Sequence, residues 1–359
     1  MIRVWTKLLY GVGLLFLSAL SPVYGVNLDS TVPGLVGPQA KLIISPSMPS
    51  DPSADGAVRY RYTINERGET TDIERIDEFR SSLFGTPTRE AITKWKFKPA
   101  TLNGVPVRWY DQYYGFVFIL PTGRRPLSQP RFKAIADQIQ ALLDSKNFAG
   151  AKSRAESEIA NASEIPKFIA LQILLAHAEL GLGRKTAALN ALEHVQLLVV
   201  KEFLPAVREL FYLQADLGQY RAANSTYAQL QRLQNNLVAM KDSSVVPIGA
   251  AESSRMQDIN RAVASELPID VMGSITGSNW SYTPVRRAFS IADVKGSLDA
   301  VIARCHLMPP ADAVTTQDVR IVLPPNAGEC ELEFQGTDGT ELHIVEYAND
   351  QPSTAVSAP

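Results

Sequence analysis

Residues 91–107 read AITKWKFKPATLNGVPV and carry the strongest structural signal in the chain. The first part of this stretch belongs to a short helix, expected over residues 88–95, whose inward-facing residues are Ala91, Ile92 and Trp95. Pro99 cannot continue the helix, and the pair Asn103-Gly104 marks a turn. Because residues 107–120 are rich in Tyr, Phe and Val, a long strand is expected to follow the turn.

Two further strands are expected before this helix. Residues 57–64 alternate in polarity and place four large side chains on one face, namely Val58, Tyr60, Tyr62 and Ile64. Residues 65–68, Asn-Glu-Arg-Gly, supply a turn, and residues 70–76 are expected to form the second strand. The order strand–strand–helix–strand predicts an α+β unit over residues 56–121.

This unit resembles the C-terminal domain of the TonB energy-transducer family. Residues 59–69, RYRYTINERGE, match the first hairpin of that family. Residues 91–107 match its later motif, an alanine-bearing helix and an aromatic-basic-aromatic step into Pro-Ala and Asn-Gly-x-Pro-Val. The matching positions are Trp95, Phe97, Pro99, Ala100, Asn103 and Gly104. A Tyr-Pro opening and a Ser-Ser-Gly turn, which the family also has, are absent here.

The resemblance implies a mode of recognition. Domains of this family pair the edge of their last strand with an extended peptide from an outer-membrane transporter, so that main-chain hydrogen bonds supply the affinity. The stretch carried over here consists of Tyr113, Tyr114, Gly115, Phe116, Val117 and Phe118. The aromatic side chains of this strand are expected to pack on the helix, so the binding hypothesis concerns the backbone. If residues 42–44 paired with this edge, peptide addition would be blocked.

Residues 128–240 have a different composition, with Ala, Leu, Gln and Glu at helical spacing. Three short segments occupy equivalent places in this region, and their alanines are Ala151, Ala188 and Ala223. The intervals between these alanines are 37 and 35 residues. A period near 34 resembles degenerate tetratricopeptide repeats, which are helical hairpins stacked side by side.

An all-β domain is expected over residues 267–347, after a linker with a short helix at 241–266. Six strands are expected, over 269–275, 287–291, 298–305, 319–323, 330–335 and 340–347. Residues 336–339, Gly-Thr-Asp-Gly, are predicted to be a hairpin loop. Cys305 ends one expected strand and Cys330 begins another, so a disulfide would link the two in this small sandwich or barrel.

Residues 1–25 have the layout of a secretory signal peptide, with Arg3 and Lys7 before a short apolar run. The alternative is an uncleaved inner-membrane anchor that faces the periplasm, since the apolar segment nearly reaches the about 20 residues that span a bilayer. Residues 26–55 are rich in proline and are expected to be a mostly extended lead-in, in which the apolar residues 42–44 offer one short edge strand. Residues 348–359 are expected to be a flexible tail.

The composition excludes several classes of protein. The 359 residues are 45% hydrophobic and 20% charged, which excludes a polytopic membrane protein, a collagen-like chain and a wholly disordered one. The formal net charge of −2 leaves no basic excess for nucleic acid or an anionic membrane. Two cysteines are too few for a cysteine-rich zinc or disulfide scaffold.

No reactive centre is predicted. Residues 181–186 lack the glycine that precedes lysine in a phosphate-binding loop. His177 and His194 do not have metal-ligand spacing, and no Gly-x-Ser-x-Gly motif occurs. A catalytic thiol at Cys305 beside His306 is a weak alternative, because neighbours along a strand point to opposite faces. We therefore expect no enzyme, no cofactor and no metal.

The leading hypothesis is a periplasmic adaptor protein that binds extended peptides or envelope proteins in outer-membrane transport. Its expected partners are proteins such as outer-membrane transporters, with no nucleic acid and only indirect membrane contact. An alternative is a structural or assembly scaffold that acts through the helical repeats, with the TonB-like unit only a packing domain. A third hypothesis is an enzyme with a site near His306 and His343.

Overall fold

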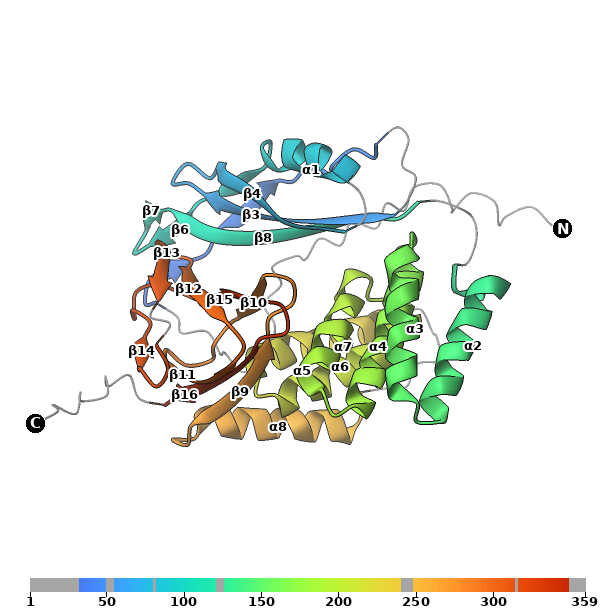
Figure 1. Ribbon diagram of the computed structural model, residues 1–359. Coiled ribbons are helices and arrows are strands. Elements are labelled where there is room, and N and C mark those ends of the chain that lie inside the picture. The colour runs from blue at the N-terminus through green and yellow to red at the C-terminus, as the bar shows by residue number, and fades with distance from the viewer. Residues whose placement is uncertain are drawn as a thin grey trace, which may run out of the picture. The chain divides into compact units, whose positions relative to one another are not determined.

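The computed structural model describes residues 32–49, 55–79, 82–120, 126–239, 248–313 and 316–348. The expected signal peptide, most of the expected tail and residues 241–247 of the expected linker lie outside these ranges. The chain divides into two compact units, the first built mainly from residues 36–125 and the second from residues 126–162 and 166–359 (Figure 1). No helix within the described ranges is long and apolar enough to cross a membrane.

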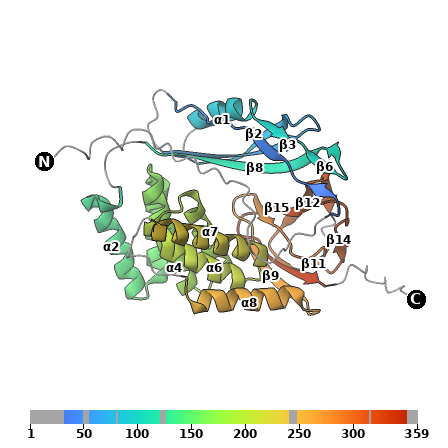
Figure 2. The ribbon, with the colours of Figure 1, turned by 180° about the vertical axis from the view of Figure 1, so that it is seen from behind.

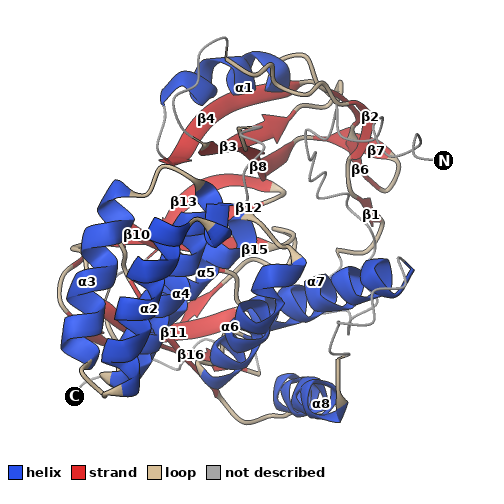
Figure 3. Cartoon of the chain, turned by 90° about the vertical axis from the view of Figure 1, so that its right-hand side faces the viewer, coloured by secondary structure: helices blue, strands red, loops and turns tan. Residues whose placement is uncertain are grey.

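The first unit is an antiparallel sheet that carries one helix on one face (Figure 3). Its central strand β3 (Gly56–Ile64) pairs with β4 (Thr70–Phe79) on one side and with β8 (Trp109–Phe118) on the other. The helix α1 (Gly85–Ile92) follows β4 and a short 3-10 turn. The predicted order strand–strand–helix–strand is confirmed.

Short strands complete the first unit, and the sequence did not predict most of them. The strand β5 (Lys96–Lys98) pairs with β2 (Gln39–Leu42) of the lead-in. The strands β6 (Ala100–Leu102) and β7 (Val105–Val107) form a hairpin that β1 (Leu35–Val36) extends. The described part of the lead-in therefore contributes two short extended strands to this fold.

An aromatic core lies between α1 and the sheet. The four residues predicted to share the inner face of β3 are all 4% exposed or less. Trp95 is wholly buried, and its ring meets the edge of Tyr114 at 4.9 Å and of Tyr62 at 5.7 Å between centroids. Such edge-to-face contacts add to the free energy that burial of apolar surface contributes.

The second unit begins with helices that follow one another in three pairs, and a short turn joins the two helices of each pair. The pairs are α2 (Pro130–Asp144) with α3 (Phe148–Asn161), α4 (Ile165–Gly181) with α5 (Lys185–Glu193), and α6 (Leu204–Asp216) with α7 (Tyr220–Ala239). Ala151, Ala188 and Ala223 are wholly buried, and each is the fourth residue of the second helix of its pair. The structure thus contains the predicted helical repeats, while their assignment as tetratricopeptide repeats stays a prediction.

The turns inside the three pairs are built alike. Each has one residue in the left-handed conformation, with φ of 59° at Lys146, 78° at Gly183 and 73° at Gly218. The next residue donates its N–H to a carbonyl five residues earlier, at 2.8, 2.9 and 2.9 Å. This is the hydrogen-bond pattern of a Schellman cap, in which glycine is the usual left-handed residue.

The last part of the second unit is a helix followed by a β-sandwich. The helix α8 (Ala250–Ala264) runs beside α6 and α7 (Figures 1 and 2). The strands are β9 (Ile269–Ser274), β10 (Asn279–Tyr282), β11 (Ala288–Lys295), β12 (Leu298–Cys305), β13 (Met308–Ala313), β14 (Ile321–Val322), β15 (Cys330–Gly336) and β16 (Glu341–Tyr347). They form two sheets, in the orders β10-β15-β12-β13 and β14-β11-β16-β9, which share one apolar core.

Residues 336–339 are not a hairpin loop, so that prediction was wrong. The strands on either side, β15 and β16, belong to different sheets. The segment instead crosses between the sheets, where Thr337 N–H bonds to Ser297 O at 3.1 Å and Gly339 N–H to Ile275 O at 2.9 Å. Alternation along a strand shows which residues face the core. It does not show which of the two sheets the strand belongs to, because both sheets face the same core.

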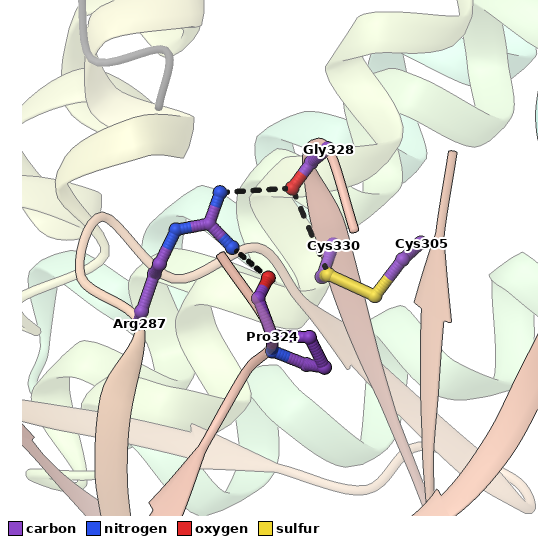
Figure 4. Close-up of a disulfide and its surroundings, with 5 residues drawn as sticks. All are labelled: Arg287, Cys305, Pro324, Gly328 and Cys330. Carbon is purple, nitrogen blue, oxygen red and sulfur yellow. Dashed lines mark hydrogen bonds between the residues drawn. A yellow bond between two sulfur atoms is a disulfide. The ribbon is translucent and has the colours of Figure 1, made fainter. Parts of the chain in front are cut away.

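The predicted disulfide between Cys305 and Cys330 is confirmed (Figure 4). The two cysteines lie directly opposite each other on β12 and β15, with their Cα atoms 4.0 Å apart. Beside them, the Arg287 guanidinium donates to the carbonyl oxygens of Pro324 and Gly328. Both sulfurs are bonded to each other, so neither cysteine is present as a thiol in this structure.

The helical pairs and the sandwich form one compact unit. Met272 N–H in β9 bonds to Leu217 O in the α6–α7 turn at 2.9 Å, and the Gln219 side-chain amide donates to Met272 O at 2.9 Å. Asn190 of α5 donates to Ser274 Oγ at 2.9 Å. The backbone edge of β9 is therefore covered by the turn of the third helical pair.

A second junction joins α8 to the sandwich through Arg286. Its guanidinium donates to the carbonyl oxygens of Ala262 at 3.0 Å and Ser265 at 2.6 Å, at the end of α8. The backbone N–H of Arg286 in turn donates to the carboxylate of Glu346 at 3.0 Å. Because Arg286 carries a positive charge at a helix C-terminus, this contact also complements the helix dipole.

Candidate peptide-binding edge

The strand β8 is the last strand of its sheet, in the order β4-β3-β8, among the residues that the structure describes. Its inner side pairs with β3 in a register that runs from Gly56 opposite Phe118 to Tyr62 opposite Gln112. The residues proposed from the family resemblance, Tyr113 to Phe118, all lie within this regular part of β8. An edge strand presents backbone N–H and C=O groups that another chain can pair with.

The aromatic side chains of β8 serve the core. Tyr114, Phe116 and Phe118 alternate along the strand and are 9%, 8% and 6% exposed. Phe118 stacks on Phe84 at 4.3 Å between ring centroids, and Tyr114 packs on Trp95. These side chains hold β8 against α1, and what remains for recognition is the backbone and the opposite face of the strand.

The lead-in does not pair with β8 in the described residues. Gln39 lies opposite Lys98 and Ala40 opposite Phe97, so β2 adds to β5. Beyond β2, the carbonyl oxygen of Ile44 accepts a 2.8 Å hydrogen bond from the Trp95 indole N–H. Residues 42–44, which would have blocked the edge by pairing with it, are instead bound to β5 and to Trp95.

The β3–β4 turn is locked onto the family motif through Gly68. Its carbonyl oxygen accepts from Phe97 N–H at 2.8 Å, and its φ is 79°. A Cβ at Gly68 would lie 1.9 Å from Phe97 O, so only glycine fits there. Asn65 closes the same turn, because its Oδ1 accepts from Glu69 N–H at 2.9 Å.

The remaining motif positions shape the path of the chain into β8. Asn103 and Gly104, with φ of 52° and 82°, form the two-residue turn between β6 and β7. Two consecutive positive φ values are typical of a type I′ hairpin, which favours Asn-Gly. Ala100 is wholly buried, and Phe97 is 5% exposed. All of these residues build the fold and none of them forms a reactive group.

Three tyrosines of β3 and β8 are buried beneath α1. Burial raises the pKa of Tyr60, Tyr62 and Tyr114 above the usual value for a phenol. Their hydroxyl groups therefore stay protonated, and that of Tyr60 donates to Gly85 O at 2.8 Å.

The two histidines of the hypothetical enzyme site belong to different sheets of the sandwich. His343 on β16 bonds to Asp270 on β9 at 2.9 Å, in one sheet. His306 follows β12 in the other sheet and donates its N–H to Glu329 O at 3.0 Å. Within the described ranges, no group of three or more His, Cys, Asp or Glu residues could hold a metal ion.

Comparison with known proteins gives the class of the first unit. Residues 51–114 match the model of the family described as Gram-negative bacterial TonB protein C-terminal. The solution NMR structure of the Pseudomonas aeruginosa TonB C-terminal domain is 24% identical, and the match covers 24% of this chain and 90% of that chain with a TM-score of 0.21. No curated protein matches this chain.

The first unit is a TonB C-terminal-like domain, as its sequence motifs predicted. Domains of this family are periplasmic, belong to no enzyme class and interact with proteins, among them outer-membrane transporters. The family match spans less than a fifth of the 359 residues, so it describes this domain and not the helical pairs or the sandwich.

Arg59 is a residue of this site that the sequence did not single out. It is the one exposed position of β3, and it lies opposite Gly115 of β8. Alternation in residues 57–64 already placed Arg59 on the face away from α1. The register that brings it beside a glycine was not readable from the sequence.

Proposed function

We propose that this chain is a periplasmic adaptor protein of outer-membrane transport, and that its TonB-like unit binds an extended segment of another envelope protein. The segment adds to β8 as a further strand. The observation that carries this proposal is the place of β8 at the end of the sheet, with the lead-in paired to β5 instead. The family of the domain supports the choice of a protein partner.

The outer strands of the two sandwich sheets, and β4 at the other edge of the β4-β3-β8 sheet, carry features that oppose strand addition. The α6–α7 turn covers β9, while β10 and β14 have only four and two residues. The edge strand β13 contains the pair Pro309-Pro310, which lacks backbone donors. Five of the ten residues of β4 are charged: Asp72, Glu74, Arg75, Asp77 and Glu78.

β8 differs from these edges in length and composition. It has ten residues, WYDQYYGFVF, with one charge and with neither proline nor lysine. Proteins usually protect such edges, because a long edge with few charges is a template for another chain. An edge left in this form is the part of the described molecule best suited to accept a strand.

The expected affinity is modest. A six-residue segment along Tyr113–Phe118 would form about six main-chain hydrogen bonds, since alternate residues of an edge strand offer both their groups outward. Each bond contributes roughly 0.5–1.5 kcal/mol, and ordering the segment offsets part of that gain. Covalent trapping is therefore a better first test than isolation of a stable complex.

The test places a photo-reactive benzoylphenylalanine at Val117 of β8 and, in a matched control, at Asp77 of β4. We expect the Val117 variant to form adducts with an envelope protein in living cells and the Asp77 variant to form none. A synthetic peptide of the trapped segment should suppress the adduct, and its N-methylated form should not, because it lacks backbone donors. Equal adducts from both edges, or none from β8, would contradict strand addition.

Periplasmic location is tested separately by fractionation of cells that express the full chain. We expect a shortened chain in the soluble periplasmic fraction, as cleavage of the segment before residue 26 requires. A full-length chain that only detergent extracts would instead support the inner-membrane anchor. Either outcome leaves the strand-addition experiment unaffected, because the photo-reactive group reports on β8 alone.

A second candidate function is a scaffold that acts through the helical pairs. It is favoured by the backbone bonds that make the helices and the sandwich one compact unit. A third photo-reactive variant, at the exposed Gln231 of α7, separates the two functions. Adducts from Gln231 without any from Val117 would favour the scaffold, and the reverse result would favour the adaptor.

A further inference from the structure

Arg59 is the only exposed residue of β3 and projects on the face of the sheet opposite α1. Its neighbours Val58 and Tyr60 are buried in the core at 2% and 3% exposure, so alternation directs Arg59 to the other face. Across the residues that the structure describes, its guanidinium forms no ion pair. An exposed arginine on a sheet face that has no such partner is available to a carboxylate from another chain.

Gly115 opens the space between Arg59 and the edge. It lies directly opposite Arg59 in the β3–β8 register, so a side chain at this position would lie on the same face. A Cβ built at Gly115 would meet only Val58 O, at 3.9 Å. The position therefore has room for a side chain but carries none, and its φ lies outside the range that demands glycine.

The geometry of an added strand makes this gap useful. A strand paired to β8 would lie two strand spacings, about 10 Å, from β3. An extended arginine side chain and a glutamate or aspartate side chain can meet over that distance only if the residue between them is small. Gly115 meets this condition, whereas Tyr113 and Val117, on the same face, would stand in the way.

We infer that the segment bound along β8 carries an acidic residue beside Gly115, and that its carboxylate pairs with Arg59. This inference rests on the proposed function and adds a side-chain preference to it. Asp77 is the one competing carboxylate in register with Arg59, on β4, and no ion pair joins the two residues. Asp77 and the edge lie on opposite sides of Arg59, because β4 and β8 flank β3.

The test uses two labelled peptides and the full chain. Each peptide has nine residues of alternating threonine and valine, with a central glutamate in one and a central glutamine in the other. Fluorescence anisotropy is expected to show about fivefold tighter binding of the glutamate peptide, as for an exposed ion pair of good geometry. The preference should shrink at high salt.

Variants assign the preference to the two residues. Arg59→Gln and Gly115→Val should each abolish it, the first by removing the charge and the second by filling the gap. Asp77→Asn should increase it, because the competing carboxylate is lost. Arg67→Gln changes the net charge equally in the distant β3–β4 turn and should leave the ratio unchanged. Circular dichroism checks that each variant is folded.

The outcomes separate this inference from the proposed function. Equal binding of both peptides to the unaltered chain would overturn the acidic preference while strand addition stands. Binding of neither peptide would contradict strand addition itself and the inference with it. A preference that survives in Arg59→Gln would overturn the assignment to Arg59.

Discussion

Replacement of Gly218 by alanine tests whether the helical pairs hold the sandwich through the α6–α7 turn. Gly218 and Gly183 are equivalent residues of two turns, and both have left-handed φ values, of 73° and 78°. They differ in surroundings. A Cβ at Gly183 would have nothing within 4 Å, whereas one at Gly218 would lie 1.9 Å from Asp270 O in β9. Gly183→Ala is therefore a matched control for Gly218→Ala.

The expected losses of stability follow from these two environments. Alanine in the left-handed conformation costs about 1 kcal/mol, and this cost applies at both positions. At Gly218 the β9 backbone must also move away, which breaks the hydrogen bonds from Met272 N–H to Leu217 O and from Gln219 to Met272 O. At about 1 kcal/mol each, these bonds raise the expected loss at Gly218 to about 3 kcal/mol.

Native-state hydrogen exchange is the suitable assay, because a chain with two compact units need not unfold in one step. The Met272 amide should exchange faster in Gly218→Ala and at an unchanged rate in Gly183→Ala. Urea unfolding followed by circular dichroism gives the losses of stability. Equal losses in the two variants, or a Met272 amide that stays protected in Gly218→Ala, would refute the reasoning.

Three further predictions concern the second unit. Lys146→Gly should stabilise the helical pairs by about 0.5 kcal/mol, because glycine relieves the left-handed strain at φ 59° but loses more chain entropy on folding. The shift of the urea midpoint measures this gain, and a lower midpoint would contradict the prediction. Burial raises the pKa of Glu346 to about 7, so its favourable contribution to the free energy of unfolding is complete below the unfolded pKa of 4.5 and is lost as pH rises to 7. That loss amounts to about 3 kcal/mol, and Glu346→Gln should remove this part of the pH dependence; parallel pH profiles for the two proteins would show that Glu346 keeps an ordinary pKa. Replacement of Cys305 and Cys330 by alanine opens a loop with a sequence separation of 25 and should lower the unfolding free energy by about 3 kcal/mol. Urea unfolding measures this loss, and reduction of the disulfide in the native protein should cause the same loss.

Local patterns predicted the parts of the fold in which one face is buried. Alternation in residues 57–64 identified the inner face of β3, and Ala91 and Ile92 marked the helix that covers it. The helix lies three residues earlier than predicted, over Gly85–Ile92, so Trp95 packs in the core from the segment that follows the helix. The spacing of three alanines located the second helices of all three pairs. The position of the cysteines at strand ends located the disulfide. Each of these signals is a pattern of residue types that can be recognised in the sequence itself, namely an apolar stripe, a small residue at a repeated helix position or a cysteine at a strand end.

The remaining features depend on contacts between distant segments. The strands β5, β6 and β7 have three residues each, too few for a periodic signal. The path of the lead-in is set by the bond from Trp95 to Ile44 O, across 51 residues of sequence. The error at residues 336–339 has the same origin, because partners in other strands decide which sheet a strand joins. The pairing of Arg59 with Gly115 likewise required the register of β3 and β8.

The cover that the α6–α7 turn provides for β9 has a consequence for the order in which the chain folds. A growing chain emerges from its amino terminus, and its leading segments generally fold first. The helical pairs precede the sandwich in the sequence, so the turn that receives Met272 is available to fold before β9 is. The first strand of the sandwich thus meets its neighbour as soon as it emerges, and its six-residue edge is shielded from other copies of the chain. If the sandwich preceded the helical pairs in the sequence, the contacts with the α6–α7 turn would form last, and the edge of β9 would stay exposed until then.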